Sequence, residues 1–343
     1  MIASSGSGVQ RLNTTTQTWN TDAALKSYTG KTIIQSGGLG VDRTAVPIAT
    51  TQVDVEAAGR LLLSPNTNAW AAAPDQKFTF GSNVAVPVNL KGGLIGQGAG
   101  DDVELGNTLN VTGTATVFIK NKAGVSGTSP STEQFTFPGP LTGPADAVLK
   151  ILASDTTSGY AQSRAKFTSA SGNTFAGTVS PGPYAVARFN GDFTQTAVTL
   201  EGGKVDGYGA IKSVTGNGIV SPDGTTGSDG IFTVGTIAPV AGTNFNFDLS
   251  TANAAPTWAN ATQSGNDVLR LTGATPLSAS LTSGNVVNLF VNTTTLASGD
   301  RFDAGFFTTA DQTALITNAN FTPYILGDGL GTAIEHSGLY YYT

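Results

Sequence analysis

The feature that most constrains this 343-residue chain is a short pattern that occurs twice. Residues 88–95 read VNLKGGLI and residues 198–205 read VTLEGGKV, so both copies follow the order Val-x-Leu-charged-Gly-Gly-x-(Ile/Val). An aromatic-x-Gly segment precedes each copy, at residues 28–30 and 175–177. A strand-turn-strand pattern that recurs in a fixed order indicates a repeat architecture, in which successive coils stack along one axis and bury a shared core.

Short runs of alternating apolar and polar residues occur along the whole chain, for example at residues 77–80 (KFTF), 114–117 (TATV) and 245–249 (FNFDL). This period of two places one face of a strand in a core and the other in water. Each run is closed by Gly, Asn, Asp or Pro, which is typical of tight turns. The sequence therefore predicts an all-β fold, with tandem β-sandwiches as the alternative to a β-solenoid. The repeated Gly-Gly corner favours the solenoid.

Composition removes several classes of function. Charged residues make up 12% of the chain, about half of the roughly 25% that is typical of soluble domains. The formal net charge of −6 provides no basic surface, so neither nucleic acid nor anionic lipid is an expected partner. With 0 Cys, a disulfide framework, a thiolate zinc site and a Cys nucleophile are all impossible. The longest apolar stretches are far below the length of a membrane span, so no membrane insertion is expected.

Several segments resemble one family of bacterial surface proteins. Residues 28–39 (YTGKTIIQSGGL) resemble the N-T-Y-x-G-x-T-x-I-x-x-G-x-L signature of the autotransporter-associated β-strand repeats. Residues 135–143 are similar to the F-x-G-x-I-x-G strand that precedes the next such motif, and residues 173–179 supply that motif. Residues 200–224 look like the terminal coils of passengers. The resemblance implies a right-handed parallel β-helix on a large secreted bacterial protein, without catalytic residues of its own.

The predicted organisation has three parts. We expect an N-terminal arm or cap over residues 1–25, solenoid repeats over residues 26–240, and terminal coils with a C-terminal cap or edge strand over residues 241–343. Residues 1–10 have neither the basic region nor the apolar region of a secretion signal. We therefore expect a mature product or an internal segment of a larger protein.

The expected function is that of a non-enzymatic structural or adhesive scaffold segment, located extracellularly at the bacterial cell surface. Its expected partners are other copies of itself or adjoining modules, together with surface glycans. Three alternatives stay open at this point. They are a self-assembling subunit of an extracellular filament or sheath, a polysaccharide-active β-helix enzyme, and a virion fibre.

Two acidic loops are candidate calcium sites, and no other cofactor is expected. Asp101 and Asp102 follow a Gly-Ala-Gly segment that partly resembles the calcium-binding nonapeptide of β-helices. Asp223 and Asp229 stand at the two ends of a second oxygen-rich loop. Carboxylate and carbonyl oxygens are the ligands that Ca²⁺ prefers. An ordinary acidic turn is the competing interpretation of both loops.

Two further groups of residues are candidates for function. Asp54 and Glu56 share one strand face, where they could act as the two carboxylates of a retaining glycosidase. They alternate with two valines, however, so an outward polar face also explains them. Tyr340, Tyr341 and Tyr342 form an aromatic β run with no turn residue after it, which predicts an edge strand that pairs with another copy or module.

Overall fold

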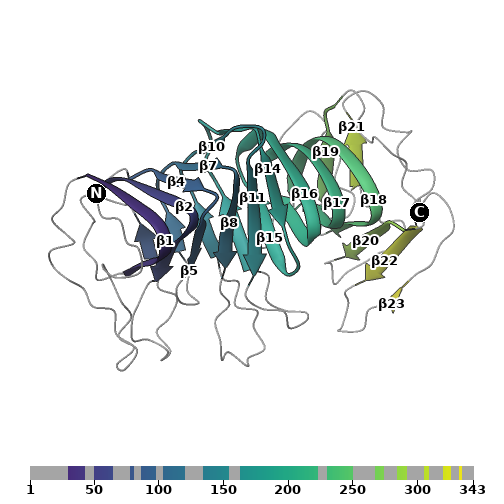
Figure 1. The fold of residues 1–343 in the computed structure, drawn as a ribbon. Coiled ribbons are helices and arrows are strands. Elements are labelled where there is room, and N and C mark those ends of the chain that lie inside the picture. The colour runs from purple at the N-terminus through teal and green to yellow at the C-terminus, as the bar shows by residue number, and fades with distance from the viewer. Residues whose placement is uncertain are drawn as a thin grey trace. The chain divides into compact units, whose positions relative to one another are not determined.

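The structure is a computed structural model, and every regular element that it describes is a β-strand (Figure 1). The chain divides into two compact units, Met1–Ala187 (unit 1) and Arg188–Thr343 (unit 2), which are described one at a time. The described residues are 30–42, 50–64, 78–80, 86–97, 103–119, 134–153, 163–222, 230–249, 267–273, 284–291, 305–308, 320–325 and 332–333.

Unit 1 is built from three columns of parallel strands. The first column contains β1 (Gly30–Asp42), β2 (Thr50–Ser64), β4 (Val88–Lys91), β7 (Leu109–Thr112), β10 (Leu141–Gly143) and β13 (Thr174–Phe175). The second column continues from the far ends of β1 and β2 to β5 (Leu94–Gln97), β8 (Thr114–Ile119), β11 (Val148–Ala153) and β14 (Thr178–Pro181). The third column contains β3 (Phe78–Phe80), β6 (Val103–Leu105), β9 (Gln134–Phe137) and β12 (Ser163–Phe167). The next strand, β15 (Ala185–Phe189), crosses the boundary between the units.

The chain visits the three columns in turn, and each circuit is called a rung here. Val88 pairs with Leu109 and Leu109 with Leu141, so one rung takes 21 residues and the next takes 32. Successive rungs pair in parallel, whereas sandwiches are built from antiparallel sheets. The predicted all-β parallel solenoid is therefore confirmed.

Alternation along each strand fills the interior. The inward residues Val53, Val88 and Leu109 are 0 to 1% exposed and lie above one another in consecutive rungs. In the third column the rings of Phe135 and Phe137 stack with centroids 4.5 Å apart. Phe137 stacks in turn on Phe167 of the next rung, at 5.1 Å. The core is thus a column of apolar side chains, each covered by its neighbours in adjacent rungs.

The repeated Gly-Gly pair has a specific backbone role. The first glycine of each copy, Gly92 and Gly202, has a φ of +76° and +89°, in the region that favours glycine. Gly93 is required for a different reason, because a Cβ there would lie 2.5 Å from the carbonyl oxygen of Glu56. Gly92 and Gly93 join β4 to β5, so the pair turns the chain from one column to the next.

In unit 2 three long strands each bend around several faces of the coil. They are β16 (Asp192–Gly207), β17 (Ala210–Pro222) and β18 (Ile231–Leu249), which pair in parallel with register shifts at the bends. β19 (Val268–Leu271) and β20 (Val286–Val291) then pair with the two ends of β18. β21 (Gly305–Thr308) pairs with β19, β22 (Asn320–Ile325) with β20, and β23 (Thr332–Ala333) is antiparallel to β22. Unit 2 is therefore also a stack of parallel rungs.

Candidate functional site

The most ordered polar feature of unit 1 is a ladder of outward side chains on the first column, called here the Asp54 ladder. It consists of Asp54, Asn89, Asn110 and Thr142, which stand opposite one another in four consecutive rungs. The residues that flank Asp54, Val53 and Val55, are 0% exposed and point into the core. Because side chains alternate along a strand, Asp54 points to the outside of the coil.

Hydrogen bonds link the whole ladder in one direction. Asn89 donates from Nδ2 to Oδ1 of Asp54 at 2.7 Å, and Asn110 donates from Nδ2 to Oδ1 of Asn89 at 3.3 Å. Thr142 donates from Oγ1 to Oδ1 of Asn110 at 3.1 Å. All three of these donors point toward the Asp54 carboxylate, so each hydrogen bond polarises the next. The ladder therefore ties four rungs together through their side chains.

Asp54 is fully buried although it faces outward. Lys91 donates to its Oδ2 at 2.7 Å, Lys31 of the preceding rung pairs with the same oxygen, and Gln52 donates to Oδ1. Burial acts to raise the pKa of Asp54, but the hydrogen bonds from Asn89, Lys31, Lys91 and Gln52 lower that pKa by more, to well below its ordinary value. The carboxylate is held ionised between two lysines.

This arrangement bears on the carboxylate pair that the sequence suggested. A retaining glycosidase needs a carboxyl group that stays protonated to act as the acid, with a raised pKa, beside an accessible nucleophile. Asp54 has a lowered pKa and no exposed surface, and Lys91 lies between the two carboxylates, 3.4 Å from Oε1 of Glu56. The same hydrogen bond to Asp54 raises the pKa of Lys91. Through these contacts Asp54 anchors neighbouring rungs.

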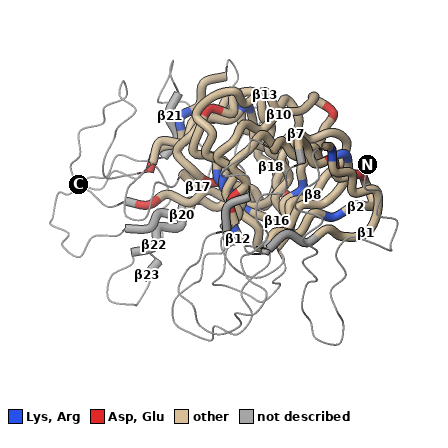
Figure 2. Tube along the Cα trace, turned by 90° about the vertical axis from the view of Figure 1, so that its left-hand side faces the viewer, with Lys and Arg blue, Asp and Glu red and all other residues tan. Residues whose placement is uncertain are grey.

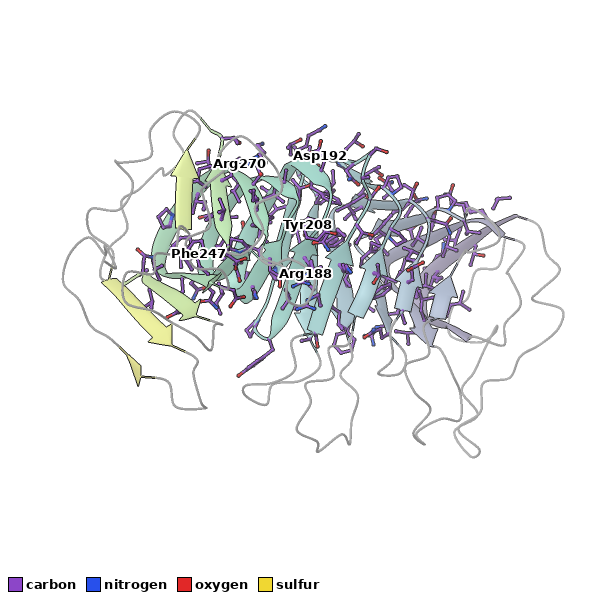
Figure 3. The ribbon with its side chains drawn as sticks, turned by 180° about the vertical axis from the view of Figure 1, so that it is seen from behind. Arg188, Asp192, Tyr208, Phe247 and Arg270 are labelled. Atoms are coloured by element: carbon purple, nitrogen blue, oxygen red, sulfur yellow. The ribbon has the colours of Figure 1, made fainter. Side chains whose placement is uncertain are left out.

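Unit 2 contains a second outward carboxylate of the same kind. Asp206 of β16 is 0% exposed and accepts two hydrogen bonds from the guanidinium of Arg188. One runs from Nε to Oδ1 at 2.8 Å and the other from Nη2 to Oδ2 at 2.9 Å. Lys204 adds a third contact, 3.4 Å from Oδ2. A bidentate Arg–carboxylate pair fixes the orientation of both side chains in addition to neutralising the charge. Since Arg188 belongs to β15, this pair also joins different strands of the coil; Figure 3 labels Arg188 in the ribbon.

Buried polar side chains also fix the corners of unit 2. The carboxylate of Asp267 accepts hydrogen bonds from the backbone N–H of Gly230 at 3.1 Å and of Asp248 at 2.9 Å. Asn285 donates from Nδ2 to the carbonyl oxygens of Val240 and Thr243, at 2.7 and 2.9 Å. These side chains satisfy backbone groups at the two ends of β18 and beside its register shift. Sequence reasoning did not single out Asp267 or Asn285.

The predicted sites fall in other parts of the chain. The calcium candidates Asp101, Asp102, Asp223 and Asp229 lie outside the described residues, as do Tyr340, Tyr341 and Tyr342. Within the ranges that the structure describes, no three His, Cys, Asp or Glu side chains are grouped so that they could hold a metal ion. In the same part of the chain no helix is long and apolar enough to cross a membrane. Figure 2 shows the charged residues of the described part scattered along the tube. The calcium and edge-strand interpretations stay predictions.

Comparison with known proteins gives no relative. No protein-family model, no curated protein and no solved structure matches this chain. The resemblance to autotransporter-associated repeats therefore stays a prediction.

Proposed function

We propose that this chain is a non-enzymatic structural scaffold segment of an extracellular bacterial surface protein. Its role is to form a coil of fixed register that separates or presents other parts of the protein, and that adheres to surface glycans. Other copies of the chain or adjoining modules are its partners.

One observation supports this proposal above the others, and it is the use that the chain makes of its outward polar groups. Asp54, Asn89 and Asn110 bond to one another across rungs, and Asp206 bonds to Arg188. A group that works on a substrate has to be accessible and poised to change its protonation or its partners. These groups instead bond to one another and hold successive strands together, as a scaffold requires.

The enzyme alternative has a direct test. The purified chain is incubated with a panel of polysaccharides, and the release of reducing ends is measured over several days. We expect no release above that of a heat-denatured sample. Release that disappears in a Glu56→Gln or Asp54→Asn variant would show that the carboxylates act on glycans and would overturn the scaffold proposal.

Filament formation is a separate matter, because it depends on residues 339–343, which lie outside the described residues. Negative-stain electron microscopy of the purified chain distinguishes the two possibilities. A scaffold segment gives discrete particles over a wide range of protein concentration. Filaments that lengthen with concentration would favour the self-assembling subunit.

A further inference from the structure

An exposed aromatic side chain marks one corner of unit 2. Tyr208 is 45% exposed, the largest exposed fraction among the large hydrophobic residues in the described part of the chain. A single exposed apolar residue is ordinary on a protein surface. Tyr208 differs from such a residue in two ways. Its backbone is fixed by a glycine on either side, and Asn190 lies at the same corner in the preceding rung.

The backbone around Tyr208 is fixed against the neighbouring rung. Gly207 has a φ of +130°, and a Cβ there would lie 2.1 Å from the carbonyl oxygen of Phe189. A Cβ on Gly209 would lie 2.3 Å from the carbonyl oxygen of Gly191, and the N–H of Gly209 donates to Phe189 at 2.9 Å. Only glycine fits at both positions. The corner therefore presents the Tyr208 ring from a rigid base, which reduces the entropy lost on binding.

Asn190 occupies the neighbouring rung at the same corner, between Phe189 and Gly191. Both polar atoms of its amide, Nδ2 and Oδ1, are screened from water and have no hydrogen-bond partner. An unsatisfied buried polar group of this kind lowers the stability of the folded state. Because the Asn190 amide makes no bond in the free protein, its rotation toward a ligand would break none.

Asp192 adds a charged group to this corner. Its backbone is in register with Ala210, the second residue after Tyr208, and its Oδ1 accepts a hydrogen bond from the N–H of Thr194 at 3.1 Å. Asp192 is exposed, and Figure 3 labels it together with Tyr208 in unit 2. The corner therefore combines an aromatic ring, an amide with both atoms unused, and a carboxylate.

We infer that this corner, formed by Asn190, Asp192 and Tyr208, is a binding site for a neutral hexopyranose unit of a polysaccharide. The apolar C–H face of the sugar ring stacks on Tyr208, because an aromatic ring offers a flat apolar body. Sugar hydroxyls, which both donate and accept, supply the two partners that the Asn190 amide lacks and bond to the Asp192 carboxylate. The negative charge of Asp192 disfavours anionic sugars. This inference rests on the proposed extracellular adhesive role and specifies its ligand class.

The test measures binding of three neutral oligosaccharides, cellohexaose, laminarihexaose and maltohexaose, at millimolar concentration. Saturation-transfer NMR and titration calorimetry are applied to the full chain. We expect at least one of them to bind, with affinity lowered at least tenfold in Tyr208→Ala and severalfold in Asn190→Ala. Asn190→Ala should not lower the melting temperature, since that amide contributes no hydrogen bond to the fold.

Tyr184→Ala is the matched control, because Tyr184 is 42% exposed, like Tyr208, but belongs to the turn between β14 and β15. Its binding should equal that of the unmodified chain. The inference is overturned if none of the three oligosaccharides binds, or if Tyr208→Ala and Tyr184→Ala weaken binding equally. Neither result bears on the structural part of the scaffold proposal, which depends on the depolymerisation assay and on microscopy. Release of shorter sugars by the chain would overturn the scaffold proposal while leaving the site in place.

Discussion

Replacing Asp54 by Asn tests whether the ladder stabilises unit 1. The substitution keeps the shape of the side chain but removes the charge that Lys31, Lys91, Gln52 and Asn89 share. Removing one partner of a buried ion pair costs about 3–5 kcal/mol when the other is left buried and unpaired. The side chains of Lys31 and Lys91 are 42% and 39% exposed, so both can return to water. We therefore expect a loss smaller than this, about 2 kcal/mol, in the free energy of unfolding.

Glu56→Gln is the matched control, because Glu56 stands two residues away on the same face. Its side chain is 38% exposed and its contact with Lys91 is 3.4 Å long, so its loss should cost less than about 1 kcal/mol. Because the chain has two compact units, a single unfolding midpoint can mix two transitions. Hydrogen exchange of the backbone amides of β2 and β4 is therefore the assay. Equal loss of protection in both variants would refute the anchoring role of Asp54.

The dependence on pH supplies an independent check of the same idea. The pKa of Asp54 is lower in the folded chain than its ordinary value of 3.8. A lowered pKa contributes stability that is fully present above the ordinary value and is lost as the pH falls through the folded value. The difference between the unmodified chain and Asp54→Asn should thus be constant near neutral pH and shrink below pH 3.8. A difference that grows on acidification would contradict the lowered pKa.

Four further predictions concern the corners, the second ion pair and the parts outside the described residues. Gly93→Ala should destabilise unit 1 by about 2–4 kcal/mol, since the new Cβ meets rigid backbone. Gly92→Ala should cost less, about 1–2 kcal/mol, because the nearest contact of its Cβ is the Cβ of Ala57 at 3.3 Å and the main penalty is the strain of its φ. Chemical denaturation ranks the two variants. Arg188→Lys should lower protection of β16 in hydrogen exchange, because a lysine cannot supply the two-pronged contact to Asp206. The two acidic loops predict a higher melting temperature with calcium than with chelator, and superimposable curves would remove them as metal sites. Deleting residues 339–343 should reduce any assembly seen by light scattering, and unchanged assembly would count against the edge strand.

Much of the fold could be predicted because it depends on local pattern. The alternation at Val53 and Val55 correctly gives an inward and an outward face, and the Gly-Gly pair at 92–93 correctly marks a corner. The partner of Asp54 could not be predicted in the same way. Asn89 is 35 residues further along the chain, and its position opposite Asp54 depends on how many residues the intervening turns consume.

A signal for the ladder was nevertheless present in the sequence. Residues 53–55, 88–90 and 109–111 read VDV, VNL and LNV, so each places Asp or Asn between two apolar residues at a strand centre. Residues 245–247 (FNF) and 287–289 (VNL) repeat this triplet in unit 2, where Asn288 donates to Asn246 at 2.8 Å. Comparing the polar centres of strands, in addition to their glycine corners, would have identified the side chains that pair.

The ladder also explains how a chain with so few charges keeps its rungs in register. In a stack of parallel strands, a slip of one residue exposes the apolar face, but a slip of two residues keeps every apolar side chain inside. The core alone therefore does not oppose the larger slip. The polar ladder opposes this two-residue slip, because the slip would separate Asp54 from Asn89 and Asn89 from Asn110. It would also leave the buried carboxylate of Asp54 without its amide donor. Sparse charged and amide groups, placed at strand centres, specify the one register that the apolar pattern leaves open.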